Sequence, residues 1–170
     1  MSGPLYRFLA ADHARLDILL GRALAVPGQI DRAAYTEFRR GLLKHIGMEE
    51  KILLPAAQRV RGGEPLPLAA TLRLDHSALA ALLVPTPTPA IISALRAILT
   101  AHNPREERPG GTYEVCEQLV GPEADALLAR LQNAPEVPVS PHADSPRVLA
   151  VMRRALARAG YQLEDVGGEA

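Results

Sequence analysis

Histidines and glutamates recur at helical spacing along this 170-residue chain. Glu49 follows His45 by four residues, and Glu106 follows His102 by the same step. Residues four apart share one face of a helix, and imidazole nitrogen and carboxylate oxygen are ligands that suit iron, manganese or zinc. Such a pair can therefore present two ligands to one metal centre. The candidate metal ligands are His13, His45, Glu49, His76, His102 and Glu106.

Each candidate ligand lies on an apolar stripe of a predicted helix. Leu9, His13 and Leu16, for example, follow one another at steps of three or four residues, so the imidazole should face the core. Burying a carboxylate without a partner costs on the order of several kcal/mol, and glutamate is almost never fully buried unpaired. Cations among these side chains would offset that cost. The stripes therefore predict a metal centre inside a helical core, whereas His142 lies in a Pro-rich segment and is expected to be solvated.

Breaker residues divide the chain into four long segments with helical periodicity. The first three helices are predicted over about 5–26, 31–61 and 68–84, and the fourth begins near residue 90. Pro104, Pro109 and the following glycines should interrupt this fourth segment before 112–120 and a shorter helix at 122–132. Short connections between long helices favour antiparallel neighbours. The fold class predicted is all-α, an up-down-up-down four-helix bundle with additional C-terminal helices.

The chain beyond this bundle has a different composition. Residues 1–132 are predicted to form the metal-binding four-helix bundle, and residues 133–170 a Pro-rich linker followed by a C-terminal amphipathic helix. That helix is expected over about 146–159, where apolar residues gather on one side and arginines on the other. It could mediate homo-oligomer formation.

Bulk composition gives no support to several classes of partner. Lys plus Arg equals Asp plus Glu at 19 each, which gives no reason to expect nucleic acid or an anionic membrane as a partner. Hydrophobic residues make up 48% of the chain, but no uninterrupted apolar run is long enough to cross a bilayer. The start of the chain does not resemble a signal peptide, and the single cysteine, Cys116, cannot form an intrachain disulfide. These features predict a cytoplasmic protein.

The two His-x-x-x-Glu pairs belong to longer motifs. Residues 45–50 read HIGMEE and are followed by Leu-Leu-Pro at 53–55, which resembles the HxxxEE…(L/F)P signature of the hemerythrin-like HHE cation-binding family. Residues 102–107, HNPREE, resemble the second copy of that motif, and Tyr113 and 127–131 are similar to the family's tail. The resemblance covers about residues 5–132.

The resemblance implies a non-haem di-iron centre. Glu49 and Glu106 would bridge two iron ions, which an oxo or hydroxo group could also bridge. His13 and His45 would bind one iron, and His76 and His102 the other. Manganese or zinc would be alternative metals. The function implied is to bind or sense a small diatomic ligand or oxidant, such as dioxygen, nitric oxide or peroxide, or to handle iron.

Two departures from the family pattern affect this expectation. Oxygen-carrying hemerythrins have a fifth histidine ligand where this chain has Leu72, so one iron would be a ligand short and reversible oxygen carriage is not expected. Pro104 lies inside the second motif, where a kink could displace Glu106 and leave Glu107 as its substitute. Four acidic residues that adjoin the motif residues could hold the imidazoles, although we expect surface charge for each. They are Asp12, Glu50, Asp75 and Glu107.

Two other functions fit the same sequence. An enzyme could use the same centre for iron–sulfur cluster repair or for turnover of peroxide or nitric oxide. A helical interaction module could instead carry core histidines without any metal.

Overall fold

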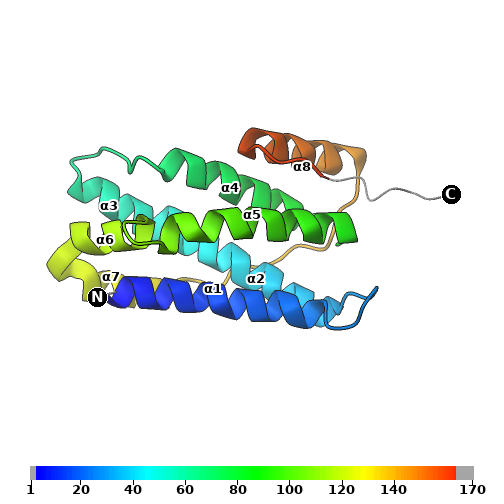
Figure 1. Ribbon diagram of the computed structural model, residues 1–170, viewed down its shortest axis with the longest axis horizontal. Coiled ribbons are helices and arrows are strands. Elements are labelled where there is room, and N and C mark those ends of the chain that lie inside the picture. The colour runs from blue at the N-terminus through cyan, green and yellow to red at the C-terminus, as the bar shows by residue number, and fades with distance from the viewer. Residues whose placement is uncertain (1–2, 164–170) are drawn as a thin grey trace. The chain divides into compact units, whose positions relative to one another are not determined.

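The structure, a computed structural model, describes residues 3–163, and this part of the chain is helical without any strand. The prediction of an all-α fold is confirmed. The elements in chain order are α1 (Pro4–Ala23), α2 (Arg32–Met48), the π-helix η1 (Glu49–Leu53), α3 (Leu54–Val60), α4 (Ala69–Leu82), α5 (Pro89–Glu107), α6 (Thr112–Val120), the 3-10 helix η2 (Gly121–Glu123), α7 (Ala124–Gln132) and α8 (Pro146–Ala159) (Figure 1).

The described residues form two compact units. Unit 1 comprises residues 3–69 and Pro104–Val139, and unit 2 comprises Ala70–Asn103 and residues 140–163. The up-down-up-down bundle would combine helices of both units, and it stays a prediction. No helix in the described part of the chain is long and apolar enough to cross a membrane.

Unit 1 is organised around the packing of α1 on α2. Leucines of α1 at steps of three and four residues, such as Leu9, Leu16 and Leu20, are buried and cover the apolar face of α2. Asp31 caps α2 because its carboxylate accepts hydrogen bonds from the amides of Ala33 and Ala34, at 2.9 and 3.0 Å. The α1–α2 pair fixes the heights of His13 and His45, which lie on these two helices.

Helices α6 and α7 close the other side of unit 1. Both pack against α1, and α6 also packs against α3. Their buried side chains join one hydrophobic cluster with the start of α1 and with the π-helical segment. Members of this cluster include Leu5, Leu9, Leu53, Tyr113, Cys116 and Leu131.

The second long segment is helical over the predicted range, from Arg32 to Val60, but it is not a uniform α-helix. Between α2 and α3 the backbone widens into the π-helix η1, where the Leu54 amide donates to the Glu49 carbonyl, five residues back. Pro55 follows directly, in the first turn of α3. Proline has no amide to donate to the carbonyl four residues earlier, and its ring would clash with that carbonyl in a regular α-helix. The π turn places the ring where no such bond is needed.

Pro104 does not interrupt the fourth segment, so that prediction was wrong. Helix α5 continues through Pro104 to Glu107, and the break comes in residues 108–111, where Gly110 has a φ of 73°. After the break the chain resumes as α6 at Thr112. A proline inside a helix removes one backbone hydrogen bond, and the next residues can still remain helical.

Unit 2 contains α4, most of α5 and α8. The Pro-rich segment before α8 is tied to the α4–α5 loop: the Ala143 amide donates to the Val84 carbonyl, and the Thr86 amide and hydroxyl donate to the Asp144 carboxylate at 2.8 and 2.7 Å. Ser145 then caps α8, which buries Met152 and Leu156. Helix α8 coincides with the predicted amphipathic helix.

Two glycines of α2 test how closely α1 and α2 approach. A Cβ at Gly41 would lie 2.8 Å from Leu16 Cδ2 on α1, whereas a Cβ at Gly47 would meet nothing within 4 Å. We expect Gly47→Ala to raise the free energy of unfolding by about 0.5–1 kcal/mol through helix propensity. Gly41→Ala should gain less or be destabilising, because Leu16 must move. Urea denaturation of both variants measures this difference, and equal stabilisation by both would contradict the close contact.

Candidate metal centre

All six residues predicted as metal ligands are buried, each at most 6% exposed. In unit 1, His13 comes from α1, His45 from α2, Glu49 from the first position of η1, and Glu106 from the end of α5. In unit 2, the other two histidines, His76 and His102, come from α4 and α5 and are described separately below.

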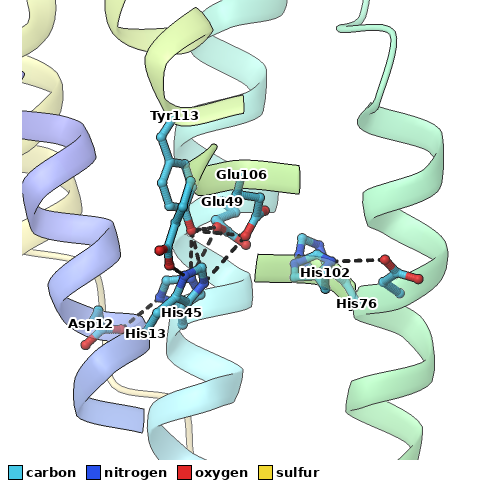
Figure 2. Close-up of polar contacts among 10 residues, drawn as sticks. Asp12, His13, His45, Glu49, His76, His102, Glu106 and Tyr113 are labelled. Carbon is cyan, nitrogen blue, oxygen red and sulfur yellow. Dashed lines mark hydrogen bonds and ion pairs between the residues drawn. The ribbon is translucent and has the colours of Figure 1, made fainter. Parts of the chain in front are cut away.

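The four candidate ligands in unit 1 form one group. One ligand atom from each of His13, His45, Glu49 and Glu106 lies within 4.8 Å of all the others, so the group could hold a metal ion. His45 Nε2 is 3.2 Å from Glu49 Oε1, and His13 Nε2 is 3.5 Å from Glu106 Oε2 (Figure 2). Glu106 thus keeps its place in the group despite Pro104, two residues earlier.

In both imidazoles of this group, the Nδ1 atom is hydrogen-bonded to a carboxylate. Asp12 Oδ2 lies 2.8 Å from His45 Nδ1, and Glu107 Oε1 lies 2.5 Å from His13 Nδ1. The expectation of plain surface charge was therefore wrong for Asp12 and Glu107. A carboxylate on Nδ1 fixes the ring so that Nε2 points inward, which is the arrangement usually found around histidine ligands of metals.

The charges around His45 hold a proton on its ring when no cation is present. Burial lowers the pKa of His45, but the Glu49 charge and the hydrogen bonds that Asp12 and Glu49 accept from the ring outweigh burial and raise it to about 10. Burial disfavours the charged form of Asp12, yet its hydrogen bonds with His45 and Arg15 lower its pKa on balance. The field in this part of unit 1 therefore attracts positive charge.

Tyr113 is a site residue that ligand spacing did not identify. Its hydroxyl donates to Glu49 Oε1 at 2.5 Å and to Glu106 Oε2 at 3.2 Å. Burial and then the charges of these two glutamates raise the pKa of Tyr113 well above its usual value. Among the sequence signals, only the resemblance to the family's tail pointed to this tyrosine.

The two histidines in unit 2 face each other. His76 Nε2 and His102 Nε2 are 3.1 Å apart, and the ring centroids are 4.8 Å apart. Asp75, which is only 1% exposed, lies 3.1 Å from His102 Nδ1, so surface charge was the wrong expectation here as well. Leu72, one turn before His76, is fully buried and offers no ligand atom.

Two surface pockets in unit 1 reach the outer carboxylates. A groove of about 590 Å³ beside α1, α2 and α7 has Asp12 in its wall, together with Arg15 and Lys44. A second pocket, of about 280 Å³, is lined by Glu107 and Glu114 among others. The carboxylates that hold His13 and His45 therefore border the surface, while the imidazoles themselves are buried.

Comparisons with protein-family models, with curated proteins and with solved structures found no match. The family resemblance stays a prediction from the motifs at 45–50 and 102–107.

The raised pKa of His45 predicts a pH-dependent stability of the metal-free protein. Because the pKa rises from 6.5 to about 10 on folding, protonation of His45 stabilises the fold fully below about pH 6.5, and this contribution is lost as pH rises through 10. NMR of the His45 ring should show it still protonated at about pH 8. Asp12→Asn should lower its pKa, and a wild-type ring that titrates near 6.5 would contradict the charge network.

Proposed function

We propose that this chain is a hemerythrin-like metal-binding protein that holds iron and uses it to bind or sense dioxygen, nitric oxide or peroxide, or to handle iron. The observation that carries the proposal is the orientation of three buried imidazoles. His13, His45 and His102 each have a carboxylate at Nδ1, so each directs Nε2 into the interior. Two buried glutamates, Glu49 and Glu106, complete the donor set of unit 1.

The donor set favours iron, manganese or zinc. It consists of nitrogen and oxygen, which suits these metals better than copper(I) or an iron–sulfur cluster. Cys116 is a poor thiolate donor because burial, followed by the Glu49 and Glu106 charges, raises the pKa of its thiol to about 12. Among these metals we choose iron because both motifs resemble the di-iron HHE family.

From the same resemblance to the HHE family, we propose two metal ions per chain. The first ion is assigned to His13 and His45, and the second to His76 and His102. Glu49 and Glu106 act as the bridging carboxylates in this proposal. The 3.1 Å separation of the Nε2 atoms of His76 and His102 supports a shared ion, because two facing lone pairs at that distance suit two bonds to one cation.

The proposed ligands are small because the six candidate ligand residues are buried, each at most 6% exposed. An iron with an unfilled position supplies a site where a diatomic molecule or peroxide can bind. Leu72 stands where the oxygen-carrying relatives have a further histidine, and its side chain leaves such a position unfilled. The protein's part is to keep the ligand residues fixed and to exclude bulk water from them.

Metal content measures the first part of this proposal. Protein purified from iron-replete cells should contain more than one iron per chain by elemental analysis. Glu49→Gln should lose most of it, and Asp12→Asn should weaken binding by about 10- to 100-fold because it releases the His45 ring. Glu37→Gln is the matched control, an exposed glutamate on α2 that should bind iron normally. Less than half an iron per chain in the wild type would count against the proposal.

A metal-free interaction module is a second candidate, favoured by the hydrogen bonds that the site residues already make. The side chains of Glu49, His45 and Tyr113 lie 2.5–3.2 Å from one another. Chelation separates the two candidates. A metal held at a free concentration 100 times its Kd adds about 2.7 kcal/mol to stability. A strong chelator should therefore lower the Tm of the metal-loaded protein by several degrees, whereas the interaction module predicts an unchanged Tm.

A further inference from the structure

The hydroxyl oxygen of Tyr113 lies close to all four candidate ligands of unit 1. Contacts from His13, His45, Glu49 and Glu106 converge on it in Figure 2. The distances from Tyr113 Oη are 2.5 Å to Glu49 Oε1, 3.1 Å to His13 Nε2, 3.2 Å to His45 Nε2 and 3.2 Å to Glu106 Oε2. A hydroxyl has only one proton, so hydrogen bonding alone does not account for four such neighbours.

These distances are those between ligands of one ion. An ion bound at about 2.1 Å to each ligand in octahedral geometry places neighbouring ligand atoms about 3.0 Å apart and opposite ones about 4.2 Å apart. Tyr113 Oη is close to 3.0 Å from three of the four atoms and nearer to the fourth. The four atoms are themselves 3.2 and 3.5 Å apart in two pairs, and all lie within 4.8 Å of one another.

We propose that Tyr113 is the fifth protein ligand of the ion held by His13, His45, Glu49 and Glu106, an inference that rests on the proposed function. The hydroxyl oxygen lies within 3.2 Å of a ligand atom from each of these four residues. When the oxygen–metal bond forms, the O–H bond breaks and its proton leaves to solvent.

The backbone holds Tyr113 firmly in this place. The chain breaks at 108–111, between α5 and α6, and Tyr113 lies in the first turn of α6. Gly111 is required there, because a Cβ would lie 2.6 Å from the Glu106 carbonyl oxygen. The Tyr113 ring is fully buried and packs edge-to-face on Tyr6 at 6.3 Å, and the Tyr6 hydroxyl donates to the Glu107 carbonyl. The phenol oxygen is thus preorganised among the ligands.

Absorption spectroscopy of the iron-loaded protein tests this assignment. A phenolate bound to iron(III) gives a charge-transfer band in the visible, and resonance Raman excitation in that band enhances tyrosinate ring modes. Wild-type protein loaded with iron and oxidised should show both signals. Tyr113→Phe should lose both signals, and its iron content and helical circular dichroism are measured on the same sample. Tyr35→Phe is the matched control, because Tyr35 is also buried but lies outside the ligand group, and it should keep both signals.

Zinc provides a second measurement that needs no oxidation. Addition of zinc to the metal-free wild type should produce the near-ultraviolet difference spectrum of tyrosinate, and Tyr113→Phe should abolish it. Bound metal without these signals, or signals that survive in Tyr113→Phe, would overturn the assignment of Tyr113 and leave the proposed function standing. Protein that binds no metal at all would overturn both.

Discussion

Burial of ionisable groups is the constraint on which the rest of this structure depends. Unit 1 places two glutamates and two histidines where water is excluded, and unit 2 does the same with two histidines and Asp75. Isolated buried charges would cost more than a marginally stable domain can tolerate. Carboxylates at the Nδ1 atoms of the imidazoles offset part of this cost. In unit 1 the Nε2 atoms and the glutamate oxygens lie close together. Such convergence of negative and neutral donors is favourable when positive charge is present among them.

Helical periodicity predicted much of this arrangement, because burial and spacing are local properties of the sequence. The stripe of Leu9, His13 and Leu16 placed one imidazole correctly in the interior, and the His-x-x-x-Glu step placed Glu49 beside His45. The all-α class and helix α8 follow from the same patterns. Six residues could therefore be assigned to buried positions from the sequence alone.

The remaining features depend on contacts between distant segments, which spacing within one helix does not report. Glu107 reaches His13 across 94 residues, and Tyr113 reaches the same imidazole across 100. Adjacency to a ligand was weak evidence for Asp12, because a charged neighbour on a helix usually faces solvent. The predicted interruption at Pro104 was wrong for a different reason. Proline lowers helix propensity, but the packing of the surrounding turns decides whether the helix continues.

The carboxylates behind the imidazoles have a further consequence for exchange with the surroundings. Asp12 and Glu107 each contact a buried ring on one side and line a surface pocket on the other. The proton on the His45 ring therefore has a path to the surface through the Asp12 carboxylate, without any opening of the helices. A molecule larger than a proton cannot pass along these hydrogen bonds. The acidity outside can therefore act on the charge of the His45 ring while the imidazole itself stays buried.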